Sequence, residues 1–168
     1  QLHGPRASAR QRARPQAGAH RAIISSMPLK ELLTRMEPSL SEDVISAANK
    51  LHYRDFITVA LIINKPHLFS DNWIYIHDPN VRMGRIQNFK NWSPDLVPDQ
   101  NTTCLGLEYF VFEKDKLWSM PDHELVNMAR QELVRIGLAR YQDITDGCVV
   151  RMPKAYPTYD TDYELAMP

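Results

Sequence analysis

Apolar residues gather in short segments that are typical of β-strands. The longest run, 56–63, is interrupted only by Thr58 and is rich in β-branched residues, which favours a central strand buried on both faces. Segment 104–112 alternates instead, with Tyr109 on its apolar face and Glu108 on the other. Four further strands are predicted at 22–26, 73–77, 82–89 and 144–152.

Helical spacing of apolar residues occurs in three other places. The clearest helix is predicted at 122–136, where Leu125, Ala129 and Leu133 fall on one face and Gly137 fits the position just after the end. Two more helices are predicted near the N-terminus, at 29–36 and 41–51. A polar segment with two prolines, 91–101, is predicted to be a loop.

The order of these elements defines the expected fold class. A helix pair is followed by several strands, then a helix, then a last strand. Consecutive strands with no helix between them favour an antiparallel or mixed sheet over a doubly wound one. We therefore predict an α+β domain, with a mixed or mostly antiparallel sheet and helices on one side.

Charge and length narrow the class of protein further. The 168 residues suit one domain, and 20 basic residues balance 20 acidic ones. This balance gives no support for a nucleic-acid partner, and no apolar run reaches the roughly 18 residues of a membrane span. Cys104 and Cys148 lie outside any CxxC motif, which favours reduced thiols in a cytoplasmic protein.

The two ends of the chain differ from its middle. Residues 1–21 carry five arginines, no acid and no apolar period, so a disordered or artefactual basic tail is expected. The domain is expected to span 22–165, with 166–168 as a truncated end.

Familiar catalytic and cofactor motifs are missing from the sequence. It has no GxGxxG or GxxxxGK[ST] phosphate loop and no GxSxG nucleophile motif. His67 and His77 are ten residues apart across a predicted loop, which is not a metal-ligand spacing, so no metal site is predicted. No catalytic residue can be assigned from motifs.

Polar side chains within predicted strands are the unusual feature. Arg85 and Gln87 share one face of their strand, and Gly84 beside them would allow a ligand to approach the backbone. Arg85 has two interpretations: a buried structural pair with Glu108, or an arginine that grips a carboxylate or phosphate. Tyr156, just after the last strand, is a second candidate for a ligand pocket.

Several stretches, taken together, resemble flavin amine oxidases and their relatives. Segment 23–29 is similar to the turn by which these enzymes leave the FAD domain, and 38–63 to the first helix and strand of their substrate domain. The remaining similar stretches are NWIYI at 72–76, GRIQN at 84–88, NWSP at 91–94, LEY at 107–109 and AYPTY at 155–159. This set resembles a branch of FAD-dependent oxidoreductases similar to protoporphyrinogen oxidase or UDP-galactopyranose mutase.

The resemblance implies a function that the chain would share with missing parts. In that family FAD is held by an N-terminal GxGxxG unit and a glycine-rich C-terminal segment, so the implied partners are a missing FAD-binding domain of the same protein and a small-molecule substrate. The chain alone is then expected to be inactive and not to hold FAD. The sheet over 56–112 would cover the flavin ring. The implied cofactor-side residues are Ser26, Met27 and Pro28, and the implied substrate-side residues are Arg85, Tyr109 and Tyr156.

Two alternatives to a partial oxidoreductase stay open at this point. A mutase-like isomerase would use the flavin as a nucleophile, with arginine and tyrosine gripping a diphosphate. A non-catalytic structural or sugar-nucleotide-binding module would need no flavin.

Overall fold

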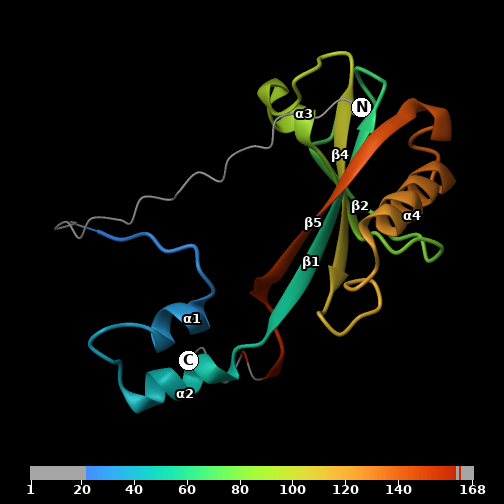
Figure 1. Cartoon of the computed structure of the whole chain (residues 1–168). Helices are drawn as coiled ribbons and strands as arrows, with labels where there is room; N and C mark the ends of the chain where they lie inside the picture. The colour runs from blue at the N-terminus through green and yellow to red at the C-terminus, as the bar shows by residue number, and fades with distance from the viewer. Residues whose placement is uncertain (1–21, 162, 164–168) are drawn as a thin grey trace, which may run out of the picture.

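The fold is a five-stranded antiparallel sheet with one long helix on one face and a helix pair at one end (Figure 1). The computed structural model describes residues 22–161 and 163, so the predictions for 1–21 and 166–168 lie outside the described residues. Its elements are α1 (Leu29–Thr34), α2 (Glu42–Lys50), β1 (Tyr53–Ile63), β2 (Trp73–Tyr75), β3 (Arg85–Asn88), α3 (Phe89–Trp92), the 3₁₀ turns Pro94–Leu96 and Tyr141–Asp143, β4 (Thr103–Val111), α4 (Asp122–Arg135) and β5 (Ile144–Pro157).

The strand order is β2-β3-β4-β1-β5, and every neighbouring pair is antiparallel. β1 lies between β4 and β5, as expected of a central strand. The α+β class and the antiparallel sheet are therefore confirmed. All five strands predicted between 56 and 152 occur, although β5 runs on to Pro157 and β2 and β3 are shorter than expected.

One face of the sheet forms the hydrophobic core. Alternate residues of β1 from Ile57 to Ile63 are fully buried there, and the apolar residues of β4 join them. α4 covers this face with Leu125, Ala129 and Leu133, each 0% exposed, as its i, i+4 spacing predicted. Gly137, with φ +77°, ends the helix as expected. The opposite residues of β1 are half-buried, so the strand is not enclosed equally on both sides.

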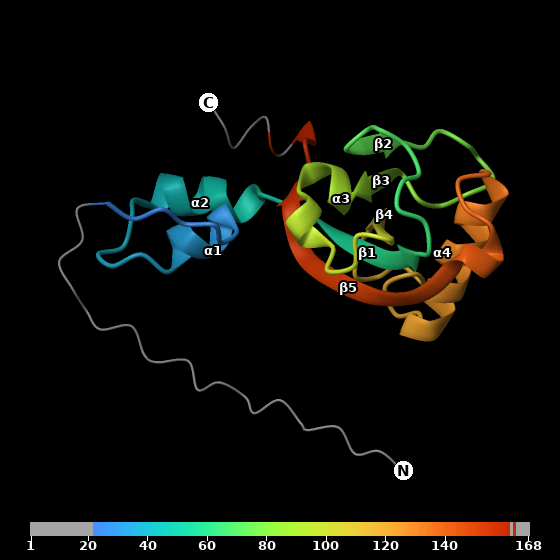
Figure 2. The ribbon, with the colours of Figure 1, turned by 90° about the horizontal axis from the view of Figure 1, so that it is seen from above.

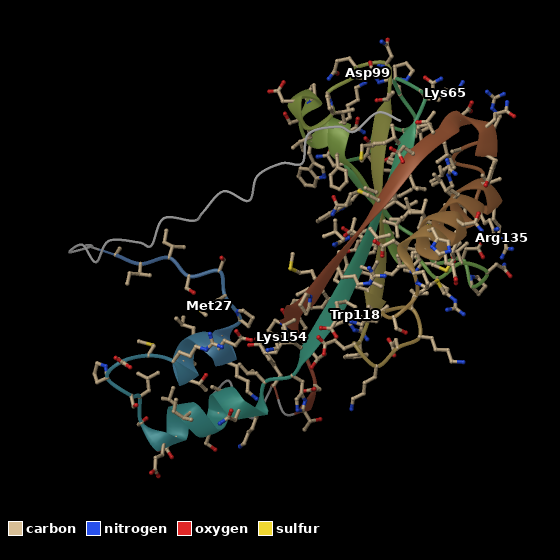
Figure 3. All side chains as sticks on the ribbon, in the orientation of Figure 1. Met27, Lys65, Asp99, Trp118, Arg135 and Lys154 are labelled. Atoms are coloured by element: carbon tan, nitrogen blue, oxygen red, sulfur yellow. The ribbon has the colours of Figure 1, made fainter. Side chains whose placement is uncertain are left out.

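The helix pair α1–α2 lies next to the start of β1, beyond one end of the sheet (Figures 1 and 2). The C-terminal end of α4 lies toward the other end of the sheet. The backbone N–H of Lys30 donates to the Tyr53 hydroxyl at 3.0 Å, and the Lys154 ammonium pairs with the Glu31 carboxylate. Figure 3 shows Lys154 on the sheet side of this junction and Met27 on the helix side.

Two local predictions are wrong. Segment 22–26 is not a buried strand: Ile23 is 86% and Ile24 is 100% exposed, and its backbone finds no partner strand among the described residues. Segment 91–101 is not wholly a loop, because α3 and a 3₁₀ turn form there. Segment 22–26 lacks the neighbouring strand that a β-strand needs, whereas in 91–101 local turns form despite the two prolines.

Candidate functional site

The face of the sheet opposite α4, here called the open face, carries the residues that could meet a ligand. It is made of alternate residues of all five strands: Arg54, Phe56, Thr58, Ala60, Ile62, Trp73, Tyr75, Arg85, Gln87, Cys104, Gly106, Glu108, Phe110, Cys148, Val150, Met152 and Tyr156. Large apolar side chains stay accessible on it, with Tyr75 56%, Met152 53% and Trp73 46% exposed. An accessible apolar surface of this kind is typical of an interaction or ligand site.

Arg85 and Glu108 form an ion pair on the open face. They are directly opposite in the β3–β4 register, and the Arg85 Nε donates to a Glu108 carboxylate oxygen. Glu108 is 5% exposed, whereas the Arg85 side chain keeps 22% of its surface accessible. Burial works against the charge of Arg85, but hydrogen bonds with Glu108 and Tyr75 outweigh it and raise the pKa of the guanidinium. The structural pair, one of the two interpretations of Arg85 from the sequence, is thus present.

Three aromatic rings surround the Arg85 guanidinium. Its carbon lies 5.2 Å from the ring centre of Trp73, 5.8 Å from that of Tyr75 and 6.0 Å from that of Phe110. These distances permit cation–π attraction, and the rings fix the direction in which the guanidinium faces. The arrangement presents a cation framed by flat apolar surfaces.

Phe110 connects this cluster to Tyr156. The two rings meet edge to face at 6.4 Å, and Phe110 also contacts Phe56 at 5.5 Å. The structure therefore brings two of the predicted site residues, Arg85 and Tyr156, to one face around a shared ring. We had expected Gly84 to leave room for a ligand beside the backbone. The Phe110 ring fills this space instead, since a Cβ on Gly84 would lie 2.5 Å from it.

Tyr109 lies on the other side of the sheet. It is fully buried in the core, and its hydroxyl donates to Glu132 Oε2 at 3.0 Å. Glu132 also accepts hydrogen bonds from the backbone N–H groups of Arg82 and Met83. Burial, the neighbouring Glu132 charge and the hydrogen bond raise the pKa of Tyr109. Tyr109 is therefore part of the hydrophobic core, on the opposite face of the sheet from Arg85 and Tyr156.

Ser26, Met27 and Pro28 lie on the exposed segment that leads into α1. Ser26 is exposed, Met27 is 41% exposed and Pro28 occupies the N-cap position of α1. Pro28 directly precedes α1, and Figure 3 shows Met27 beside the helix pair, away from the sheet. The resemblance implies a place near the flavin for these three residues, and that role stays a prediction.

The sequence reasoning missed Arg54 as a site residue. It precedes the apolar run of β1, and its alternation with Asp55 and Phe56 places it on the open face, opposite Tyr156. That alternation was readable in the sequence. What could not be read is whether the guanidinium has a partner, because this depends on how β4 and β5 pack around it.

The two cysteines offer a probe of the open face. Cys104 is opposite Ile62 and half-buried, whereas Cys148 is opposite Ala60 and exposed. Burial, with a smaller effect of Cys148, raises the pKa of the Cys104 thiol to about 11. We expect Cys148 to react with iodoacetamide at pH 8 much faster than Cys104, of which only about 0.1% is thiolate at that pH. Mass spectrometry would measure both rates, and a fast phase that persists in Cys148→Ser would contradict this assignment.

Neither a metal centre nor a membrane span is found in the part of the chain that the structure describes. Residues 22–161 and 163 hold no group of three or more His, Cys, Asp or Glu side chains placed to bind a metal ion. No helix within these residues has the length and apolarity needed to cross a bilayer.

Comparison with known proteins finds solved structures with a similar fold. No protein-family model and no curated protein sequence matches the chain. Among solved structures, two share the fold of this chain. One neighbour is reduced UDP-galactopyranose mutase, with a TM-score of 0.62, 21% identity, and coverage of 83% of this chain and 30% of the mutase. Another is a putative protoporphyrinogen oxidase from Exiguobacterium, with a TM-score of 0.59, 17% identity, and coverage of 79% and 29%.

These likenesses concern the fold. The chain spans about 30% of the length of the two neighbours, so most of each neighbour has no counterpart in it. Both names are those of the groups that the sequence stretches resemble.

Proposed function

We propose that this chain is the substrate-side portion of an FAD-dependent oxidoreductase, with the open face turned toward the cofactor and the substrate. The observation that carries the proposal is the asymmetry of the sheet. One face is sealed by α4, while the other keeps Trp73, Tyr75 and Met152 about half exposed around a fixed guanidinium. A planar ring system fits against such a flat aromatic surface.

The residues present fit one part of FAD and not the rest. The open face could contact the flavin ring, and Arg85 and Tyr156 could orient an anionic substrate against it. The segment of Ser26, Met27 and Pro28 could contribute backbone contacts from the helix pair. Among the described residues nothing forms a glycine-rich turn at a helix N-terminus that would hold the pyrophosphate. A separate FAD-binding domain of the same protein is therefore part of the proposal.

In this proposal FAD would supply the redox step, and the chain's own residues would bind the substrate and orient it. Arg85, held by Glu108, keeps a fixed positive charge at the aromatic cluster. Tyr156 packs edge to face against the Phe110 ring. The accessible rings exclude water once the face is covered, which strengthens the electrostatic grip on an anion.

A mutase-like isomerase is the second candidate, favoured by the likeness to UDP-galactopyranose mutase. It uses the same face and the same cofactor. Net consumption of an electron acceptor during turnover would support the oxidoreductase, and turnover without net redox change would support the isomerase.

The test is to express the whole reading frame that contains this chain. We expect flavin absorbance at a one-to-one ratio after gel filtration, and slower labelling of Cys148 than in the 168-residue chain because the open face is covered. Equal Cys148 labelling in a colourless full-length protein would overturn the proposal and leave the structural or sugar-nucleotide-binding module.

A further inference from the structure

Asp146 and Gly147 form the only Asp-Gly or Asn-Gly pair in the sequence. Asp146 is exposed near the start of β5, an edge strand that is paired, among the described residues, with β1 alone. Its carboxylate Oδ1 accepts a hydrogen bond from the backbone N–H of Gly147 at 2.7 Å. The side chain is thus held directly against the peptide nitrogen that follows it.

Other exposed aspartates direct their carboxylates differently. Asp78 accepts from the N–H of Asn80 at 2.8 Å, and Asp99 accepts from that of Asn101 at 2.9 Å, two residues along in each case. In the described part of the chain, Asp146 is the only aspartate that accepts a hydrogen bond from the N–H of the next residue. The difference matters chemically, because the nitrogen of the next residue is the one that can close a cyclic imide with the side chain.

The backbone beside Asp146 is irregular. Asp146 is opposite Ile62, but the next pair is Ile63 with Ile144, so a β-bulge leaves Thr145 without an opposite residue. A bulge interrupts the ladder, and a strand end of this kind opens locally at a lower cost than a regular strand. Ring closure needs a turn of the backbone at Asp146, which such an opening permits.

Glycine favours ring closure at this position. It has no side chain to shield its nitrogen, and its backbone adopts conformations that other residues avoid. The packing of β1 against β5 keeps a glycine here, because a Cβ on Gly147 would lie 2.8 Å from the Leu61 side chain and 3.1 Å from the Ala60 carbonyl oxygen. The fold therefore retains a chemically reactive pair on an accessible strand.

We propose that Asp146–Gly147 is a site of spontaneous backbone modification, at which aspartate converts to isoaspartate through a succinimide. The Gly147 nitrogen bonds to the carboxyl carbon of Asp146 and loses its proton, and the hydroxyl of the carboxyl group leaves as water. Water then adds to one of the two ring carbonyls. Opening at the side-chain carbonyl restores aspartate, whereas opening at the backbone carbonyl gives isoaspartate. The reaction needs no oxidant or cofactor, since both reacting groups are already side by side.

The product would loosen the start of β5. Isoaspartate adds one methylene to the backbone between Asp146 and Gly147. The longer part of β5 after Gly147 is held by β1 along its length, so the short end before it has to shift. At that end the N–H of Asn64 donates to the carbonyl of Asp143 at 2.7 Å. We expect this hydrogen bond to be lost in the modified chain.

The experiment ages the 168-residue chain at 37 °C in neutral buffer. Trypsin digestion and mass spectrometry with electron-transfer fragmentation then locate isoaspartate residue by residue. Asp99 is the internal control, because it is also exposed but is followed by Gln100. We expect at least about tenfold more isoaspartate at Asp146 than at Asp99, since glycine leaves the attacking nitrogen unshielded.

Asp146→Glu is the matched variant. Glutamate keeps the negative charge, but its longer side chain closes an imide ring far more slowly. Peptide 141–151 should therefore split into isomeric forms with age in the parent and not in the variant. Hydrogen exchange of the Asn64 amide gives a second measurement: it should become faster in the aged parent and stay unchanged in aged Asp146→Glu. Thermal unfolding verifies that the variant is folded.

Two results would overturn the proposal. Isoaspartate no more abundant at Asp146 than at Asp99 would mean that the strand prevents ring closure. Equal acceleration of Asn64 exchange in the aged parent and in aged Asp146→Glu would assign the loosening to a different lesion. Neither result involves flavin or substrate, so this proposal and the proposed function fail separately.

Discussion

Replacement of Leu133 with aspartate is expected to unfold the sheet domain. Leu133 is 0% exposed and packs in the core between α4 and the sheet. A carboxylate at this position would be buried without a partner, at a cost on the order of 3 kcal/mol or more. Since domains of this size are stable by only about 5–15 kcal/mol, the loss removes much of the total. Urea unfolding followed by circular dichroism would measure it.

The control lies on the same helix. Asn127 is exposed on α4, and Asn127→Asp introduces the same charge where water can solvate it. We expect this change to stay within about 0.5 kcal/mol of the parent. If both variants unfolded at the same urea concentration as the parent, α4 would not be packed on the sheet in solution.

The elements that were predictable from sequence are those whose own pattern determines their burial. In α4 the i, i+4 spacing of Leu125, Ala129 and Leu133 predicts which side of the helix faces the core. These three side chains are buried in the structure. In β4 the alternation places Tyr109 and Glu108 on opposite faces of the sheet, although both side chains are buried. Such periodicity survives folding because burial of apolar area is the dominant favourable term.

Features that depend on distant partners were less predictable. Segment 22–26 has the composition of a strand, but a strand also needs a neighbour to satisfy its backbone groups, and none is present in the described part. The site shows the same limit. Period two placed Arg85 and Glu108 on strand faces, yet the β3–β4 register decides that they are opposite each other. The unpaired state of Arg54 likewise appears once β4 and β5 are in place.

The Arg85–Glu108 pair is expected to contribute strongly to the stability of the open face. Glu108→Gln leaves the guanidinium without its carboxylate in a half-buried place. Loss of one partner of a fully buried pair costs about 3–5 kcal/mol, and because Arg85 keeps 22% of its side-chain surface accessible we expect about 2–3 kcal/mol here. Urea unfolding of the 168-residue chain would measure the change.

Arg85→Lys tests what the fork adds to the charge. Lysine keeps the positive charge but loses the Nε donor to Glu108 and the flat surface that stacks on Trp73 and Tyr75. A lower stability that is not additive with Glu108→Gln in the double variant would demonstrate the coupling between the two side chains. Arg35→Lys is the matched control, because Arg35 is exposed and meets Glu31 at 4.0 Å in a surface pair worth about 0–1 kcal/mol.

The same substitution separates a scaffold role for Arg85 from a ligand role. In the full-length enzyme, a large stability loss with unchanged turnover would assign Arg85 to the scaffold. Loss of turnover at an unchanged melting temperature would assign it to the substrate. The structure leads us to expect a fall in both, because the Nε side of the guanidinium is bonded to Glu108 while part of the side chain stays accessible among the aromatic rings. Unchanged stability and unchanged turnover in Arg85→Lys would contradict the pair and the proposed site together.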